Sequence, residues 1–526
     1  MKITNKPYPY YEHEEINNLL ELLELNKKRN PNNISFSYRN GMDKKNKTFS
    51  DVYDDVLYLS NYFNSKYKNE HIGLIGENSY NWIITFLSIV LSGNVCVVFD
   101  KDCDEKKLEE LLKYSDTKTI YYSNKYCSFV GDMKYKTFTL EDINSFIEEG
   151  KSLENKYKID NCSDACIFFT SGTTGPSKGV VLSQKNIASN IYGASSLFKP
   201  DGSVLSVLPF HHAFGLITSV LKPFYYGKEV FINNSLKYIT RDLSLVKPNT
   251  LFLVPLFVET FYKQIWQTAK KKKKDKKLKN AIKISNCLLK VGIDLRDKLF
   301  KDVRDVFGGN LKYIICGGAY LDKKYVKWFR SVGIEILNGY GITECSPVVS
   351  VNRNNYYRDG SIGVACLFEE VKIMDGEICI KGPNVMKGYY KDKKSTSSVL
   401  IDGYFHTGDL GYIDEDGFIF LTGRKKNIII LSNGENVSPE EIESVLLKDE
   451  GVCEVIVYEM GDKIIASIYP EEEYFDNQEY FDDLIYKYNK NKPKNHQIAF
   501  VNLRKTEFIK NSNKKIIRSK ALEENN

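Results

Sequence analysis

The feature that most constrains this chain is a regular alternation of short apolar runs with helical stretches. Apolar runs at His71–Ile75, Val95–Phe99 and Thr119–Tyr122 are separated by helical patterns at Asn81–Leu91 and Glu105–Tyr114. Strands linked through helices in this order pair in parallel, and helices cover both faces of such sheets. The pattern therefore predicts an α/β fold built on parallel-rich sheets in helix–sheet layers (αβαβα).

The alternation returns in the middle of the chain, at Lys312–Cys316, Lys323–Val332 and Ile334–Leu337. The chain has 526 residues, which corresponds to roughly three to four folding units at about 150 residues each. An apolar fraction of 42% and a charged fraction of 27% are ordinary for a globular protein and exclude a disordered chain or a fibre.

The pattern of apolar and turn-forming residues changes in the C-terminal third of the chain. From about Lys372 short strand-like segments alternate with glycine turns, and Asp414–Gly417 (DEDG) predicts a hairpin. This predicts a small β-barrel-like subdomain. After Asn427 a strand, a turn, a helix and a strand follow in close succession, which indicates a separate α+β domain. We expect a large N-terminal domain over 1–424 and a small mobile C-terminal domain over 425–526.

Charge and cysteine usage narrow the class of protein. The 74 basic and 68 acidic residues leave a net charge of +6, which gives no whole-chain case for nucleic-acid binding. The 11 cysteines form no CxxC pair, so we expect reduced thiols in a cytoplasmic protein, not disulfides or structural zinc. The N-terminus shows no apolar signal segment, and polar residues interrupt Trp82–Phe99, which predicts a buried helix and strand and not a membrane span.

The segment with the strongest excess of positive charge is Lys270–Lys277 (KKKKKDKK). We interpret it as a solvated face. The alternative is a patch that attracts an anionic membrane surface or cofactor phosphates. We therefore expect at most weak peripheral membrane contact.

Phe168–Gly179 (FFTSGTTGPSKG) joins an apolar strand to a loop rich in glycine and hydroxyl residues. Glycines let backbone N–H groups approach a phosphate, hydroxyls donate further hydrogen bonds, and Lys178 supplies a positive charge. The spacing does not fit the GxxxxGK[ST] pattern of P-loop enzymes. The segment predicts a polyphosphate-binding loop, with a flexible Gly/Ser turn as the alternative.

Asn338–Glu344 (NGYGITE) follows an apolar strand and predicts a glycine-rich turn at its carboxyl end, where ligands bind in parallel sheets. The Thr343 hydroxyl suits a phosphate and the Glu344 carboxylate suits Mg²⁺. A plain surface carboxylate is the alternative.

Two later segments carry one candidate each. Tyr404–Lys426 (YFHTGDLGYIDEDGFIFLTGRKK) places Asp409 in a tight Gly–Asp turn, where it could accept hydrogen bonds from ribose hydroxyls or simply shape the turn. Phe508–Arg518 (FIKNSNKKIIR) presents Lys515 on a polar turn, or forms only a basic tail.

In order and spacing, these four segments resemble the adenylate-forming superfamily of acyl-CoA synthetases, luciferases and peptide-synthetase adenylation domains. The resemblance covers nearly the whole chain. It implies an AMP-forming acid–thiol ligase that binds ATP, Mg²⁺, a small-molecule acid and CoA. In the family, a carboxylate attacks the α-phosphate of ATP, a thiol then attacks the acyl-adenylate, and the small domain swings about a hinge between the two steps.

The resemblance also implies roles for individual residues. The phosphate loop would be Thr170, Ser171, Gly172, Thr173, Thr174, Gly175 and Lys178, and the adenine-binding stretches Gly317, Gly318, Ala319, Asn338, Gly339 and Tyr340. Asp409 and Arg424 would contact the ribose, Lys426 would be the hinge, and Gly434, Glu435 and Asn436 would line the CoA tunnel. Catalysis would fall to Lys515, Thr343, Glu344 and His212, with Glu344 as the metal ligand.

One departure concerns the catalytic lysine. The family usually places glycine directly before it and often proline earlier in the motif, whereas this chain has Lys514 and Ile509. Lys514 is therefore the rival candidate.

The sequence gives less information on the identity of the carboxylic acid substrate. Pro209–Gly215 (PFHHAFG) aligns with the family's acyl-pocket motif, which points to His212, Phe214 and Gly215; His212 could also be only a packed loop histidine. No aspartate lies between Val204 and Phe224 to bind an α-amino group. Ile265–Gly318 is similar to bacterial long-chain fatty-acid–CoA ligases, so we expect a medium- or long-chain fatty acid.

Two other functions stay open. The chain could load its acyl group onto a separate acyl carrier protein in place of CoA. It could also be a catalytically silent scaffold that keeps the nucleotide-binding fold.

Overall fold

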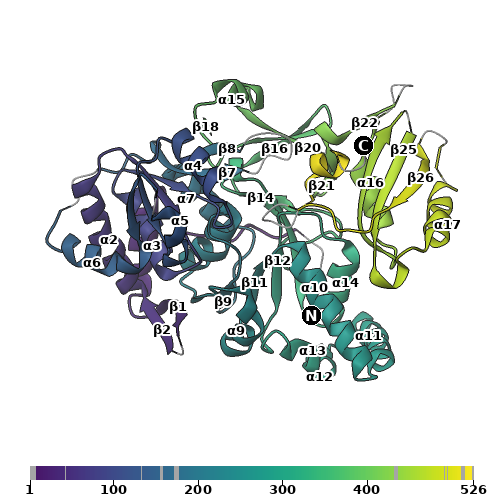
Figure 1. Ribbon diagram of the computed structural model, residues 1–526. Helices are drawn as coiled ribbons and strands as arrows, with labels where there is room; N and C mark the ends of the chain where they lie inside the picture. Colours follow the sequence, from purple (N-terminus) through teal and green to yellow (C-terminus); the bar gives the residue numbers. More distant parts are fainter. Residues whose placement is uncertain are drawn as a thin grey trace. The chain divides into compact units, whose positions relative to one another are not determined.

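The computed structural model describes residues 7–41, 43–131, 133–154, 158–170, 177–431, 436–461, 463–490, 492–493, 496–510 and 516–523 (Figure 1). These residues form two compact units. The first is drawn from 1–170, 177–370 and 381–403, and the second from 371–380 and 404–526.

One sheet of the first unit carries the predicted βαβαβ order. Its strands β3, β4 and β5 pair in parallel, and they match the three predicted apolar runs to within one residue. Helix α3 (Tyr80–Leu91) is almost wholly buried and ends before Gly93, so the prediction of a buried helix and strand is confirmed. In the described residues the order is β18 (Gly388–Tyr389), β8 (Lys178–Ser183), β7 (Asp164–Thr170), β4 (Val95–Val98), β3 (His71–Ile75), β5 (Thr119–Tyr122) and β6 (Lys136–Thr139).

The second sheet of this unit is also parallel at its centre, through β9, β11, β12 and β13. Among the described residues its order is β15 (Val364–Ala365), β14 (Val348–Val351), β13 (Glu335–Gly341), β12 (Tyr313–Cys316), β11 (Thr250–Leu253), β9 (Val204–Ser206), β10 (Val230–Ile232), β1 (Ile34–Asn40) and β2 (Asp43–Thr48).

Helices pack on these sheets with their apolar faces inward. A core of β9, β11, β12 and β13 side chains, for example, is covered by Phe261 and Ile265 of α10 and Val326 and Phe329 of α14. The longer helices are α1 (Leu19–Arg29), α2 (Phe49–Lys66), α4 (Glu105–Tyr114), α6 (Ile143–Gly150), α7 (Gln184–Ser195), α9 (Ile239–Val246), α10 (Pro255–Lys271), α11 (Asp275–Lys290) and α14 (Lys323–Ser331). The short ones are α5 (Cys127–Val130), α8 (Lys222–Tyr225), α12 (Arg296–Leu299), α13 (Lys301–Asp305) and α15 (Lys393–Val399), with a π-helix, η3, at Phe214–Leu221.

The prediction of a glycine-rich turn at Asn338 is wrong. Strand β13 continues to Gly341 because β14 pairs with it antiparallel. The glycines serve this close pairing, since a Cβ on Gly341 would lie 2.2 Å from the Pro347 carbonyl oxygen. The turn that presents Thr343 and Glu344 begins only after Gly341, as the 3₁₀ turn η5 (Thr343–Cys345).

The second unit is α+β. Strands β16 (Glu370–Met374), β17 (Glu377–Lys381), β20 (Tyr404–Ile413) and β21 (Ile419–Arg424) belong to an antiparallel sheet. Beyond it, β22 (Ile429–Ile430) pairs with β23 (Asn436–Val437), and β24 (Val452–Met460), β25 (Lys463–Pro470) and β26 (Ile498–Leu503) form a sheet. Helices α16 (Pro439–Leu446) and α17 (Gln478–Asn489) share its apolar core, and α18 (Arg518–Glu523) follows.

This compact unit takes in β20 and β21, which precede the predicted boundary. The division at residues 424 and 425 concerns a moving domain, and it stays a prediction. In the part of the chain that is described, no helix combines the length and apolarity needed to cross a membrane.

Candidate active site

Two of the predicted residues meet on one tyrosine of the first unit. The Tyr389 hydroxyl donates to Glu344 Oε1 at 2.9 Å, and the Lys178 ammonium lies 4.6 Å from the centre of the same ring. Strand β18 pairs Tyr389 with Val180 of β8, two residues after Lys178, which places the ring beside the lysine. A cation over an aromatic face is attracted by the ring's negative face. The arrangement therefore holds a cation and a carboxylate at the end of the β7–β8 hairpin.

The backbone around Glu344 is firmly held. The amides of Asn190 and Asn384 both donate to the Cys345 carbonyl, at 3.0 and 2.8 Å. The Ser346 hydroxyl donates to the Asn384 carbonyl at 2.8 Å, and Ser346 adopts a left-handed conformation with φ of 64°. These bonds fix the short turn η5, so Thr343 and Glu344 leave it in defined directions.

Tyr389 is the residue that sequence reasoning missed. It lies in a two-residue strand, and nothing in KGYYKD distinguishes it from ordinary surface aromatics. Burial, and then the neighbouring Glu344 carboxylate, raise the pKa of Tyr389, so its hydroxyl keeps its proton and donates. It acts here as a neutral link between a cation and an anion.

A narrow cavity of about 50 Å³ lies between η3 and the ends of β12 and β13. It brings together five predicted residues: Phe214 from the acyl-pocket motif, and Gly317, Gly318, Gly339 and Tyr340 from the adenine-binding stretches. The fit at Gly317 is tight, because a Cβ there would lie 3.3 Å from the Phe214 ring, which would have to shift slightly. Ala319 and Asn338 adjoin these residues in sequence but do not line the cavity.

The cavity wall also carries three polar side chains that the sequence did not suggest, Thr218, Lys222 and Ser350. The Thr218 hydroxyl is buried and has no hydrogen-bond partner in the described structure. Lys222 donates to the Ala194 carbonyl at the end of α7, at 2.9 Å, and burial lowers its pKa to about 8.

His212 lies just before η3, next to His211. Burial, and then His211, lower the pKa of His212 to about 3, so its ring is neutral at ordinary pH. Its Nε2 atom is shielded and has no partner in the described structure. His211 Nε2 lies 3.1 Å from Asp100 Oδ1, although the angle between them does not meet hydrogen-bond geometry. Gly215 is needed for close packing, because a Cβ there would lie 2.0 Å from the Pro209 carbonyl oxygen.

In the second unit, Asp409 and Arg424 face each other across the β20–β21 hairpin. Arg424 Nε lies 2.7 Å from Asp409 Oδ1, and the Asp409 side chain is only 6% exposed. The predicted tight turn at Asp409 is wrong, since the residue lies within β20. Gly408, with φ of 73°, and a register shift after Leu410 bend the strand there, which is why the sequence resembles a turn.

A second ion pair joins the end of this hairpin to the neighbouring strand β17. Lys425 Nζ lies 3.0 Å from Glu377 Oε2, and the Gly408 backbone N–H donates to Glu377 Oε1 at 2.7 Å. Burial alone would raise the pKa of Glu377, but Lys425, Gly408 and His406 together lower it. Lys426, the predicted hinge, follows in the exposed 3₁₀ turn η6 (Lys425–Asn427).

Some predicted residues lie outside the described residues. Of the candidate CoA tunnel, only Asn436 is described, and it is exposed in β23. The residues outside are Ser171, Gly172, Thr173, Thr174, Gly175, Gly434, Glu435 and Lys515.

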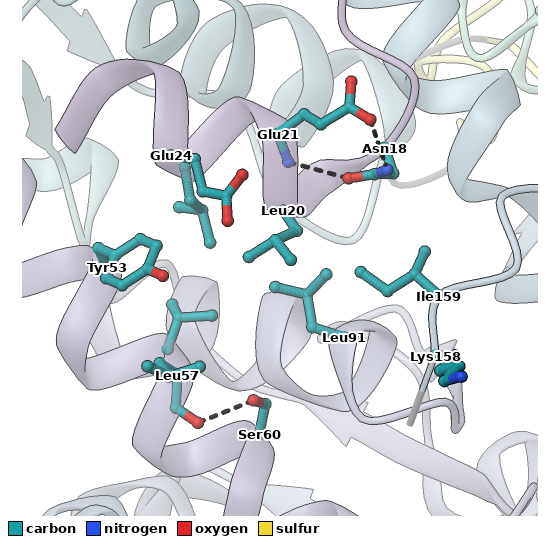
Figure 2. A pocket seen from close by; sticks show the side chains of 12 residues that line it. Asn18, Leu20, Glu21, Glu24, Tyr53, Leu57, Ser60, Leu91, Lys158 and Ile159 are labelled. Carbon is teal, nitrogen blue, oxygen red and sulfur yellow. Dashed lines mark hydrogen bonds between the residues drawn. The ribbon is translucent and has the colours of Figure 1, made fainter. Parts of the chain in front are cut away.

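A larger cavity, of about 520 Å³, lies between α1 and α2 (Figure 2). None of the predicted site residues lines it. Its best-defined polar groups bond to each other, as Asn18 Oδ1 accepts from the Glu21 N–H at 2.9 Å and Asn18 Nδ2 donates to Glu21 Oε1 at 3.0 Å. The larger cavity therefore has no link to the residues that the sequence analysis named.

Comparison with known proteins gives one family. The model of the AMP-binding enzyme family matches residues 23–390. Long chain acyl-CoA synthetase 4 of Arabidopsis thaliana is 30% identical over 514 residues, covering 85% of this chain and 77% of that protein. Long-chain-fatty-acid–CoA ligase 5 of Mus musculus is 34% identical over 317 residues, which span 56% of this chain and less than half (46%) of the ligase.

A solved structure agrees on the fold. O-succinylbenzoate coenzyme A synthetase of Bacillus subtilis, in complex with ATP and magnesium, superposes with a TM-score of 0.75 at 20% identity, over 95% of this chain and 98% of that one. The family match and the ligase relatives support an AMP-forming acid–thiol ligase. The chain therefore belongs to the AMP-binding enzyme family, within the adenylate-forming superfamily.

Proposed function

We propose that this chain activates a carboxylic acid in two steps, first as acyl-AMP with release of pyrophosphate and then as the CoA thioester. The observation that carries this proposal is the convergence of Lys178 and Glu344 on Tyr389. It is supported by a cavity that acyl-pocket and adenine-binding candidates line together and that reaches Gly341, three residues before Glu344. Family membership supplies the reaction class.

The first step opposes two anions. A carboxylate oxygen attacks the α-phosphorus of ATP, a new O–P bond forms, and the bond to the β-phosphate oxygen breaks so that pyrophosphate leaves. Two unit charges about 4 Å apart repel by about 4 kcal/mol at an effective dielectric of about 20. Lys178, and Lys515 from the second unit, would offset this repulsion as charge builds on the phosphate oxygens. No protein nucleophile is needed, because the substrate itself attacks.

Glu344 has the chemistry expected of a Mg²⁺ ligand. Its carboxylate offers hard oxygen donors, and η5 holds it rigidly next to the lysine that would face the phosphates. When bound, the ion would neutralise phosphate charge. Thr343 would donate its hydroxyl to a phosphate oxygen, and Asp409 with Arg424 would hold the ribose.

In the second step a CoA thiolate attacks the acyl carbonyl, a C–S bond forms, the C–O bond to the bridging oxygen breaks, and AMP leaves with that oxygen on its phosphorus. We propose that residues 425–526 move as a domain about Lys426, so that Lys515 serves the first step and Gly434, Glu435 and Asn436 line the thiol path in the second. The cytoplasm remains the expected location.

The acid we propose is a medium- or long-chain fatty acid. Relatives with long-chain acyl-CoA ligase names support it, as do the apolar Phe214 and neutral His212 of the acyl motif. The cavity of about 50 Å³ is too small for such a chain, so side chains such as Phe214 must move when the acid enters.

Acid-dependent ATP–pyrophosphate exchange tests the proposal. The purified chain is assayed with acids of increasing chain length and with amino acids, and then for thioester formation on CoA and on holo-carrier proteins. Exchange driven by fatty acids and thioester formation on CoA support it. Thioester formation on a carrier alone would make the chain a loading enzyme, and no exchange with any acid would support the scaffold.

Lys515→Ala tests whether Lys515 serves only the first half-reaction. It should lower adenylate formation at least about a hundredfold, as expected for loss of a charge used in the transition state. Thioester formation from added acyl-AMP should be largely retained. An equal fall in both half-reactions would contradict the two-conformation scheme, and a wild-type exchange rate would shift the role to Lys514.

Glu344→Gln keeps the side chain's shape but removes its charge. Exchange should fall by about a hundredfold and its Mg²⁺ dependence should shift to higher concentration. The matched control is Tyr389→Phe, which removes only the hydrogen bond to Glu344 and should cost about tenfold or less. If Tyr389→Phe were as damaging as Glu344→Gln, the carboxylate would act through the tyrosine and not through a metal ion.

A further inference from the structure

The positive charge of this chain is concentrated in one segment. Residues Lys270–Lys301 contain 13 basic and 3 acidic residues, a net +10, whereas the whole chain carries +6. The rest of the chain is therefore at −4. This segment spans the end of α10, all of α11, α12 and the first residue of α13.

The structure leaves these charges in solvent. Ten lysines from Lys270 to Lys290 are exposed. Among the described residues, this segment takes part in few ion pairs: Lys274 with Asp302 at 3.6 Å, Arg296 with Asp294 at 2.7 Å, and Asp297 with Arg304 at 3.4 Å. Most of the lysine charge therefore has no acidic neighbour on this surface.

Large apolar side chains are exposed in the same segment. Ile284 on α11 is 57% exposed, and Val291 and Ile293, directly after α11, are 71% and 48% exposed. Leu295 and Leu299, around α12, are exposed too. A solvated basic face does not require these side chains, and their exposure carries a hydration cost.

On helix α11, Lys276, Lys283 and Lys290 are seven residues apart and lie along one side. Ile284 lies about 100° around the helix from Lys283, and Val291 and Ile293 follow directly after the helix. The opposite side, with Leu278, Ala281 and Ile282, packs on the core of the first unit. We call Lys276, Lys283, Lys290, Ile284, Val291 and Ile293 the α11 face.

We propose that the α11 face docks on an anionic lipid surface. Lysines beside exposed aliphatic side chains are the composition of helices that lie in a membrane interface, with ammonium groups at the headgroups and apolar groups between them. A nucleic acid would use the lysines but would leave Ile284, Val291 and Ile293 in water. This inference does not depend on the proposed reaction.

Vesicle flotation tests it with the full chain. We expect binding to phosphatidylcholine vesicles that contain phosphatidylglycerol and little binding to phosphatidylcholine alone. Lys276→Glu/Lys283→Glu/Lys290→Glu should weaken binding by about a hundredfold. The matched control, Lys28→Glu/Lys106→Glu/Lys118→Glu, makes the same charge change at exposed lysines elsewhere on the first unit and should weaken binding by less than about threefold.

Val291→Ser/Ile293→Ser separates a lipid surface from a polyanion. It leaves the charge unchanged and lies outside the helix, and it should weaken vesicle binding by about tenfold. The proposal is overturned if anionic vesicles do not bind, if the control triple variant is as defective as the α11 variant, or if the serine variant binds normally while a duplex RNA binds as tightly as the vesicles do.

Discussion

Buried ionisable groups have different surroundings in two regions of the molecule: the cavity beside η3 and the β20–β21 hairpin. Near the cavity, Lys222 and the largely buried His212 form no ion pair with a carboxylate in the described residues, although Asp100 lies close to His212, and burial lowers the pKa of both. At the hairpin, Asp409 of β20 and Glu377 of the adjacent strand β17 are also buried but face Arg424 and Lys425.

The difference fits what each region is proposed to hold. Burial without a counter-charge favours neutral forms, which suits an apolar acyl chain. Paired charges remain charged inside the protein, and a ribose hydroxyl can join a hydrogen-bonded carboxylate at little cost. Burial alone therefore does not determine which ligand group a buried side chain can bind. The presence or absence of a partner decides which chemistry a buried group can serve.

Asp409→Asn should produce the largest effect, because it breaks the paired arrangement and leaves Arg424 without its carboxylate. We expect the ATP dissociation constant to rise by about tenfold to a hundredfold. Since Arg424 is 41% exposed, the free energy of unfolding should fall by only about 1–2 kcal/mol. Glu415→Gln, an exposed charge change at the tip of the same hairpin, is the control and should alter neither. Wild-type ATP affinity in Asp409→Asn would show that the ribose assignment is wrong.

His212→Asn tests the region without ion pairs through the pH dependence of the free energy of unfolding. The pKa of His212 is about 3 in the folded chain and 6.5 in the reference state, so the unfolded chain binds the extra proton between these values. Stability should therefore fall as pH drops below about 6.5, and between pH 7 and 5 the wild type should lose about 1–2 kcal/mol more than the variant. Denaturant midpoints at both pH values measure this. Parallel loss in both proteins would mean that His212 carries a proton when folded.

Lys222→Met should give the smallest change. The pKa of Lys222 is about 8 when folded and 10.5 in the reference state, so the unfolded chain holds the proton in this range and stability gains as pH rises from 8 to 10.5. The variant should lack this gain, a difference of about 1 kcal/mol between pH 8 and pH 9. A larger loss of stability at pH 7 would mean that Lys222 is mainly a cap for α7.

Regular elements were predictable where local pattern and tertiary structure agree. The runs of β3, β4 and β5 are apolar because both faces of a parallel sheet are covered, and α3 and α4 end at polar or glycine residues. Asn338–Gly341 failed for the opposite reason: its composition favours a turn, but pairing with β14 holds it as a strand.

The site shows the same division. Lys178, Glu344, Asp409 and Arg424 could be named as candidates because their residue types suit phosphate, metal and ribose, and these roles stay predictions. Tyr389 could not, because it reaches Lys178 and Glu344 only through the pairing of β18 with β8, more than 200 residues away in sequence. The predicted hairpin places Asp409 and Arg424 on neighbouring strands. Their direct pairing could not be predicted, because it depends on the register shift after Leu410.

The most direct test of acyl-AMP formation is the fate of a carboxylate oxygen. The chain is incubated with ATP, Mg²⁺, CoA and a fatty acid labelled with ¹⁸O in its carboxylate, and the AMP is examined by mass spectrometry. The account predicts that each AMP carries one ¹⁸O, because the attacking oxygen stays on phosphorus when the thiolate displaces it. Acyl-CoA formed together with unlabelled AMP, or with ADP in its place, would contradict it.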